Sequence, residues 1–132
     1  MRSDNHKLDA ATLQILAYKH ERITAYALAL VRAGRALVLQ RGIDRVASDD
    51  VPDAEVPQDT QDAGIPGSAI NMLITAHVLE RTGERRASKR PSANGRWISV
   101  YRLASLAVAE TWIHRNGGSV ESQQRELFNA AI

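Results

Sequence analysis

The sequence predicts a mainly α-helical protein with a small β-hairpin, formed by a chain of 132 residues as one domain with short extensions. Two observations lead to this prediction. Apolar residues recur every three or four positions in three stretches, which is the period of an α-helix. One later segment alternates every second residue and carries aromatic and β-branched side chains, which is typical of a β-strand.

The composition is that of an ordinary globular chain, with 44% hydrophobic and 24% charged residues. The absence of cysteine excludes a disulfide framework, a thiolate metal site and a cysteine nucleophile. We expect no apolar run of the roughly 18 residues that a transmembrane helix needs, and the N-terminus lacks the apolar segment of a secretory signal. A cytoplasmic protein without membrane contact is therefore expected.

A long helix, or two helices with a break near His20, is expected over residues 10–41. Asp9 can cap its start and Gly42 its end. One face follows alternating steps of three and four residues, and this seam consists of Leu13, Leu16, His20, Ile23, Ala27, Leu30, Gly34 and Leu37. The seam is interpreted as the buried face of a core helix, or as a face that also pairs with a second copy. A homodimer is expected, through this seam or through the C-terminal helix that carries Trp112.

Residues 43–66 hold three of the four prolines and a cluster of acids. Ser48 is suited to be an N-cap because Asp49 and Asp50 follow it in a first helical turn, where the helix dipole favours negative charge. We expect a short helix from Ser48 and an exposed loop over residues 53–66.

A further helix is expected over Gly67–Leu79, with no Lys or Arg between Ser68 and Leu79. Its apolar face follows the i, i+3, i+4, i+7 spacing and consists of Ile70, Leu73, Ile74 and His77, so the histidine is expected to be buried. Its opposite, polar face consists of Ser68, Asn71 and Thr75.

Two strands are expected next, over Val78–Thr82 and Arg96–Leu103, joined by a basic loop that contains the turn dipeptide Asn94-Gly95. Trp97 and Tyr101 alternate onto one side of the second strand. Tyr101 is expected in the core, and Trp97 in the core or in packing within the hairpin, with stacking on a base as the alternative.

The net charge is only +2, but the charges are segregated. Residues 44–62 carry seven acids and one base, a local net of −6, and residues 81–102 carry seven bases and one acid, a local net of +6. Such blocks are commonly solvated loops. The basic block is more informative because it falls on the hairpin; its bases are Arg81, Arg85, Arg86, Lys89, Arg90, Arg96 and Arg102.

Helix, short helix, helix and hairpin is the order of a winged helix-turn-helix, whose third helix enters the DNA major groove while the hairpin, or wing, lies on the phosphate backbone. We expect this domain over residues 22–103, with an acidic loop at 44–62 and the wing at 78–103. Residues 1–21 and 104–132 are expected to be helical extensions, the last ending in a short helix from Ser119 to Phe128.

The run Thr82-Gly83-Glu84-Arg85-Arg86-Ala87-Ser88-Lys89-Arg90-Pro91-Ser92-Ala93-Asn94-Gly95-Arg96, followed by Ile98-Ser99-Val100-Tyr101, resembles the wing of small winged-helix proteins common in phages and prophages. Val46–Val51 is similar to the start of their second helix, and Pro66–Ala69 to the start of their third. The resemblance covers residues 22–103 and implies a winged-helix fold and DNA association, in a family whose members are mostly uncharacterised. Relatives tend to carry Arg at the positions of Asn71 and Thr75, so we expect weak base readout here.

The predicted function is binding of double-stranded DNA, as a phage-type transcription regulator or replication accessory. The expected phosphate contacts come from the wing, through Arg81, Arg85, Arg86, Ser88, Lys89, Arg90, Ser92, Asn94 and Arg96. The expected base contacts come from Ser68, Asn71 and Thr75. If about five bases neutralise phosphates, log K falls against log salt with a slope of about −4 to −5. This hypothesis requires that carboxylates of the same chain leave the basic side chains unpaired.

Two other functions stay open. A winged helix can act as a protein-interaction module, inhibiting or adapting a host or phage protein, and an exposed helix without Lys or Arg suits that use. A small nuclease would need acids that the fold brings together, but the chain has no nucleotide-binding or catalytic motif. The four histidines lack metal-ligand spacing, so we expect no enzyme, cofactor or metal site.

Overall fold

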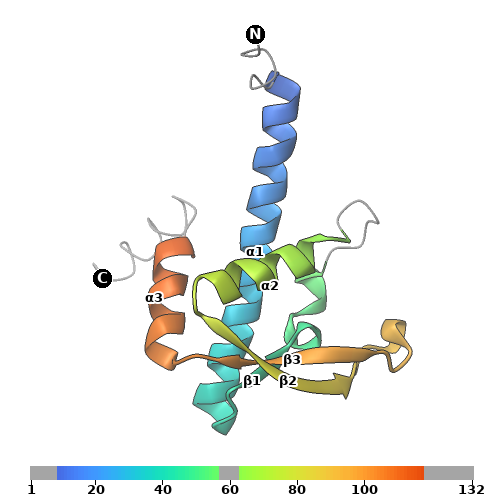
Figure 1. Ribbon diagram of the computed structural model, residues 1–132, viewed down its shortest axis with the longest axis vertical. Coiled ribbons are helices and arrows are strands. Elements are labelled where there is room, and N and C mark those ends of the chain that lie inside the picture. Colours follow the sequence, from blue (N-terminus) through green and yellow to red (C-terminus); the bar gives the residue numbers. More distant parts are fainter. Residues whose placement is uncertain (1–8, 57–62, 118–132) are drawn as a thin grey trace, which may run out of the picture.

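The computed structural model describes residues 9–56 and 63–117 and shows three α-helices around a three-stranded antiparallel sheet (Figure 1). The elements in chain order are helix α1 (Ala10–Arg41), strand β1 (Arg45–Ala47), the 3₁₀ turns Ser48–Asp50 and Asp53–Glu55, helix α2 (Ile65–Thr75), strand β2 (Leu79–Ala87), the 3₁₀ turn Pro91–Ala93, strand β3 (Trp97–Leu103) and helix α3 (Leu106–Asn116). The mainly α class with a β-hairpin is therefore confirmed.

Helix α1 is a single continuous helix with the predicted ends. The Asp9 side chain accepts a hydrogen bond from the Thr12 backbone N–H at 2.7 Å, and Gly42 ends the helix with a left-handed φ of 66°. The buried residues of the helix lie between Tyr26 and Gly34, whereas residues 13–21 are exposed. His20, predicted at a core position of the seam, is one of these exposed residues.

Contrary to the expectation from the sequence, α1 is long and apolar enough to cross a membrane by length and composition. A core helix meets the same criterion, and the stretch of α1 from Tyr26 to Gly34 has that role here, whereas Leu13, Leu16 and other apolar residues nearer its start are exposed. Leu30 and Val31 are fully buried, and buried Gly34 lets the helix approach Val46 and Leu103 of the sheet.

Strand β1 was not predicted, because three residues are too few to show an alternating pattern. It pairs with β3 on the side away from β2, so that the sheet order is β1-β3-β2. Strand β2 is longer than predicted and takes up the first half of the basic loop. A bulge between Arg81 and Arg85 interrupts its pairing, and Gly83 adopts a left-handed φ of 77° there.

Instead of one short helix from Ser48, the chain forms two 3₁₀ turns separated by Pro52. Ala47 rather than Ser48 precedes the first turn, and its N–H donates to the Asp50 side chain at 2.8 Å. Proline disfavours a helical conformation in the residue before it, which explains why the first turn does not continue.

Helix α2 is displaced from the predicted range Gly67–Leu79 at both ends. It starts at Ile65, because Pro66 is well tolerated in a first helical turn, and it ends at Thr75. His77 has a left-handed φ of 61° and is exposed, so the prediction of a buried histidine is wrong. The chain reverses at this residue and continues into β2.

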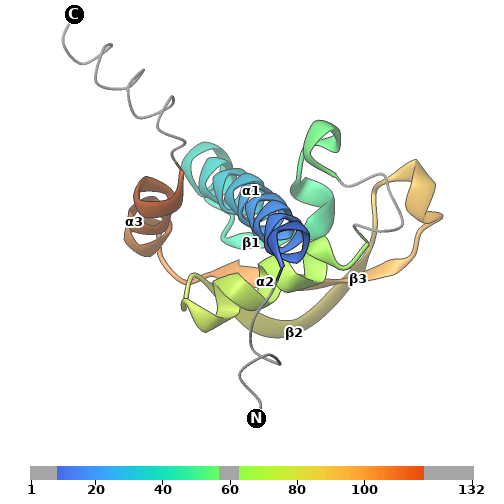
Figure 2. The ribbon, with the colours of Figure 1, turned by 90° about the horizontal axis from the view of Figure 1, so that it is seen from above.

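Helix α3 starts at Leu106, with the Ser105 side chain accepting from the Val108 N–H at 3.0 Å. It packs beside α1 through fully buried Ala109, and Figure 2 shows α3 and the 3₁₀ turns on opposite sides of α1. The short helix predicted from Ser119 lies outside the described residues.

Replacing Gly34 with alanine is expected to raise the free energy of unfolding by about 0.5–1 kcal/mol, because alanine favours a helix. An added Cβ would meet Leu103 at 3.6 Å and Val46 at 3.7 Å, which are ordinary contacts. Gly34→Leu should instead overpack the same space and destabilise the protein. Urea unfolding measures both, and a clear loss of stability in Gly34→Ala would contradict this account.

Candidate nucleic-acid interface

The acidic turn, defined here as residues 48–53, folds onto the hairpin and is held there by Arg86. The Arg86 guanidinium donates to Asp49 and, at 3.1 Å, to Asp50. Asp49 also accepts the backbone N–H of Lys89 at 2.9 Å, and its side chain is only 1% exposed. A buried charge is tolerated when it is paired and hydrogen-bonded, so this contact is part of the structure of the protein.

Arg90 holds the other end of the acidic turn. Its guanidinium donates to the Asp53 side chain and to the carbonyl oxygens of Ser48 and Val51. The hydroxyl of Ser88, a predicted phosphate contact, accepts the Arg90 backbone N–H at 3.2 Å. Arg90 and Ser88 therefore shape the hairpin loop.

A third base of the hairpin is paired across the strands. Arg102 of β3 lies opposite Glu80 of β2 and donates to its carboxylate at 2.8 Å. Arg86, Arg90 and Arg102 are therefore held by carboxylates of the same chain, so the requirement of unpaired basic side chains fails for these three of the seven bases. The other four make no ion pair in the part of the chain that the structure describes: Arg81, Arg85, Lys89 and Arg96.

The outer half of the hairpin has one free face. Arg85 pairs with Ser99 and Ala87 with Trp97, so these four side chains point to the same side of the sheet. All four are exposed, whereas Arg86 and Ile98, which point to the other side, are partly buried. The acidic turn thus occupies one face, and the other face, with Arg85 and Trp97, is open to solvent.

Trp97 is 61% exposed, so of the placements expected for it the core is wrong. Tyr101, four residues later on the same strand, is buried as predicted. The difference arises because β2 and β3 extend beyond the helices, as Figure 1 shows on its right side, and Trp97 lies in this extension. The alternation along the strand predicts which side of the sheet Trp97 faces, but it does not predict where along the strand the core ends.

The loop between the strands carries further exposed polar groups. Arg96 is exposed next to Trp97, and Asn94 adopts a left-handed φ of 50° in the turn. Lys89 is exposed as well, and its positive charge helps to lower the pKa of nearby Asp49. The side chain of Ser92 lies outside the described part of the structure.

The predicted polar face of α2 is present. Ser68, Asn71 and Thr75 are all exposed, while Ala69 and Leu73 bury the opposite face in the core. Amide and hydroxyl groups at these positions can exchange hydrogen bonds with base edges, but they supply no charge.

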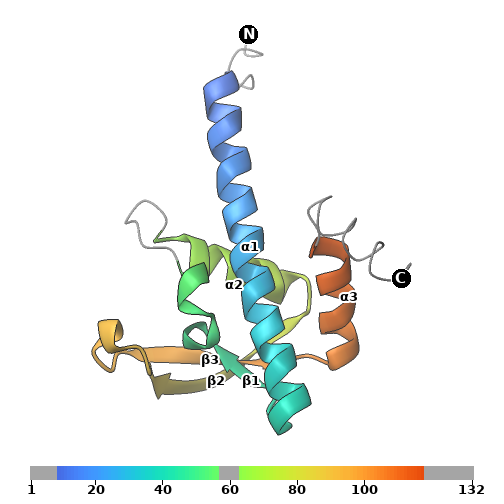
Figure 3. The same cartoon turned by 180° about the vertical axis from the view of Figure 1, so that it is seen from behind.

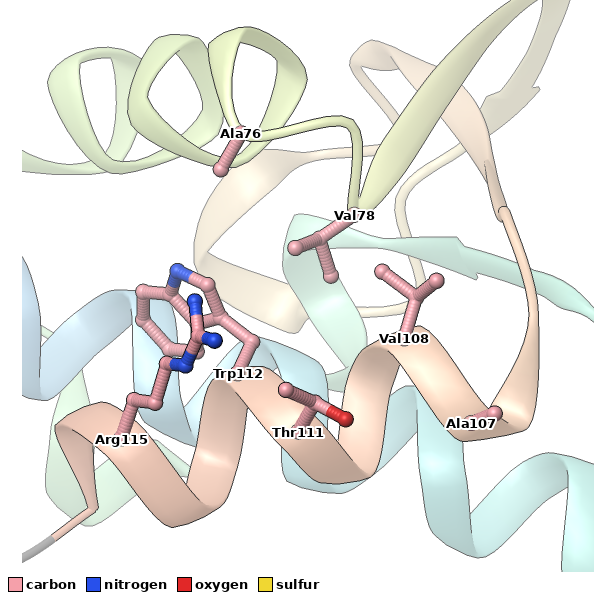
Figure 4. Close-up of a pocket in the computed structure, with 7 residues that line it drawn as sticks. All are labelled: Ala76, Val78, Ala107, Val108, Thr111, Trp112 and Arg115. Atoms are coloured by element: carbon pink, nitrogen blue, oxygen red, sulfur yellow. The ribbon is translucent and has the colours of Figure 1, made fainter.

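A separate pocket of about 250 Å³ lies between the end of α2, the start of β2 and α3. Figure 4 shows the Trp112 ring and the Arg115 side chain at one end of it, facing Ala76. Its lining is mostly apolar and belongs to the packing of α3, away from the free face of the hairpin. In the described residues, no group of three His, Asp or Glu side chains gathers as a metal site.

Comparisons with known proteins give no relative: no protein-family model matches the chain, and no curated protein or solved structure matches it significantly.

Acid is expected to weaken the contact between the acidic turn and the hairpin. Burial alone would raise the pKa of Asp49, but the hydrogen bonds from Lys89 and Arg86 and their charges outweigh it, so the pKa lies below its ordinary value of 3.8. The unfolded chain therefore takes up this proton first, and the stability from Asp49 is complete above about pH 4 and lost as the pH falls further.

Asp49→Asn is expected to cost about 2 kcal/mol of unfolding free energy at pH 7, because Arg86 loses a charged partner. The variant should also lose less stability than the unsubstituted protein between pH 5 and pH 2.5. Urea unfolding followed by circular dichroism tests both points, with Asp53→Asn as a control because the Asp53 side chain is 94% exposed. Equal pH dependence in Asp49→Asn and the unsubstituted protein would be evidence against this role.

Proposed function

We propose that this chain is a winged helix-turn-helix protein that binds duplex DNA through the free face and loop of its hairpin, as a phage-type regulator or replication accessory. One observation carries the proposal: four exposed cations of the hairpin make no ion pair in the described structure, namely Arg81, Arg85, Lys89 and Arg96. Exposed cations without ion-pair partners suit contact with a polyphosphate.

The order of the elements supports the winged-helix interpretation. Helix α1, the acidic turn, helix α2 and the β2–β3 hairpin follow one another as in that fold, and β1 adds a third strand beside β3. Helix α2 would enter the major groove with its polar face, where Asn71 can pair with adenine. Because α2 has no exposed Lys or Arg, sequence preference would be modest.

The number of free cations sets the expected salt dependence. Each phosphate neutralised on duplex DNA contributes about −0.9 to the slope of log K against log salt, so four contacts give about −3.6. This slope is shallower than the value expected when about five bases are available. The bases held by the acidic turn would instead keep the hairpin in one conformation before DNA arrives, which lowers the entropy cost of binding.

A second candidate function is protein interaction without DNA. It is favoured by the uncharged exposed face of α2 and by the apolar exposed residues of α1, such as Leu13 and Leu16, which are 52% and 50% exposed. Pull-down in the presence and absence of nuclease separates the two functions, since a nuclease-resistant partner combined with weak DNA binding supports this candidate.

Removing two free cations should weaken DNA binding and flatten its salt dependence. The double variant Arg85→Ala/Arg96→Ala is expected to lower the slope by about two and to reduce affinity at least tenfold at low salt. Fluorescence anisotropy with a labelled duplex at several salt concentrations measures both quantities. Arg102→Ala is the matched control, because this base is already paired with Glu80. An unchanged slope in the double variant would count against the proposal.

Trp97 should report binding directly because it lies on the same face as Arg85. In a Trp112→Phe background Trp97 is the only tryptophan, and duplex DNA is expected to quench its fluorescence. In a Trp97→Phe background the remaining Trp112, on α3, should respond little. Equal quenching of the two tryptophans would show that the hairpin face is not the binding surface.

A further inference from the structure

Trp97 is the largest side chain on the free face of the hairpin, and its neighbours on that face leave it uncovered. Its partner across the strands is Ala87, and Ser99 is the next residue of β3 on the same face, so both neighbours are too small to shield an indole ring. In the part of the chain that the structure describes, the ring makes no hydrogen bond and no cation–π contact. Figure 3 shows the outer end of the hairpin projecting past all three helices.

The backbone holds this ring in a fixed place. Trp97 is the first residue of β3, and Ala87 is the last residue of β2. Just beyond this pair, the Ser88 N–H donates to the Arg96 carbonyl oxygen at 2.8 Å, and the Arg96 N–H donates to the Ala93 carbonyl oxygen at 2.9 Å. The end of the hairpin is therefore already ordered, so a ligand that contacts the ring does not have to order it.

Two cations flank the ring. Arg85 lies on the same face, opposite Ser99 and thus diagonal to Trp97. Diagonal neighbours in a sheet are about 7–8 Å apart, so the guanidinium can reach a phosphate attached to a base on the ring. Arg96 precedes Trp97 in the chain and is exposed, and neither arginine has an ion pair among the described residues. An aromatic ring for the base and cations for the backbone are what proteins use to bind unpaired nucleotides.

We propose that the free face of the hairpin binds DNA at an unpaired base, on which Trp97 stacks. The inference rests on the proposed DNA binding and names its substrate class, a duplex that contains a bulge, a gap or a frayed end. In an intact duplex the neighbouring bases cover both faces of each base, and an already unpaired base costs least to take out of the stack.

The charges on this face favour DNA over a protein partner. An apolar protein surface on Trp97 would remove water from Arg85 without supplying a negative charge, which is unfavourable. A phosphate next to the stacked base supplies that charge.

Fluorescence anisotropy with two labelled probes tests the preference. One probe is an intact duplex, and the other is the same duplex with one unpaired adenine in its middle. The second probe should bind about tenfold more tightly, which is the effect expected from one base stacked on an aromatic side chain. Both probes should give the same slope of log K against log salt, because the added contact is not ionic.

Two substitutions of Trp97 separate stacking from simple apolar contact. Trp97→Leu keeps an apolar side chain without an aromatic face and should bind both probes equally, as tightly as the unsubstituted protein binds the intact duplex. Trp97→Phe should keep part of the preference. Both variants should give unchanged circular dichroism, because the replaced side chain is exposed. Trp112→Phe, on α3, is the matched control and should keep the full preference.

A fluorescent adenine analogue, 2-aminopurine, at the unpaired position reports the stacking itself. Its emission should fall when the unsubstituted protein saturates the probe and should stay unchanged with saturating Trp97→Leu. At a paired position in the intact duplex, its emission should change with neither protein.

The outcomes distinguish this inference from the proposed function. Equal, salt-dependent binding of the two probes by the unsubstituted protein would refute the inference and leave duplex binding in place. Binding of the bulged probe alone would support the inference and refute binding to intact duplex, whereas binding of neither probe would refute both. A preference that survives in Trp97→Leu would also refute the inference. So would equal binding of both probes combined with a nuclease-resistant protein partner that is lost in Trp97→Leu.

Discussion

The contact between Arg86 and the two neighbouring aspartates is the constraint on which the shape of the hairpin depends. Asp49 is almost completely buried, and it accepts hydrogen bonds from both the Arg86 side chain and the Lys89 backbone. A buried carboxylate loses its hydration and needs such partners. The acidic turn and the hairpin must therefore form together, although almost 40 residues separate them in the sequence.

Because of this contact, the basic residues of the hairpin have different roles. Arg86 and its neighbour Arg85 are adjacent in the chain but point to opposite sides of the sheet. Arg86 is partly buried against the acidic turn, and Arg85 is open to solvent. The local net charge of +6 therefore overstates what a polyanion would meet, because part of that charge is neutralised within the chain.

The sequence predicts the helices well where their ends carry clear signals. Asp9 and Gly42 delimit α1 at the predicted residues, because a cap and a left-handed glycine are local features. The end of α2 was predicted four residues too late, because apolar residues continue through Val78 and Leu79, of which Val78 lies in the connection after the helix and Leu79 begins β2.

The candidate site was predictable in part. The position of the basic hairpin follows from composition and period, but the pairing of Arg86 and Arg90 with the acidic turn is a tertiary contact. The opposite signs of the two charge blocks were the available signal for it. The sequence could not decide whether Trp97 lies in the core, because alternation identifies a side of a strand and does not show where neighbouring helices stop covering it.

Because Asp49 is buried, the conformation of the hairpin and its attraction for other molecules respond differently to ionic strength. Mobile ions reduce the attraction between solvent-exposed charges over a Debye length of about 10 Å at 0.1 M, but they screen a buried pair much less. The contact of Asp49 with Arg86 should therefore persist in concentrated electrolyte, while Arg85 and Arg96 become screened. The hairpin would then keep its conformation under conditions that remove its electrostatic attraction for other molecules.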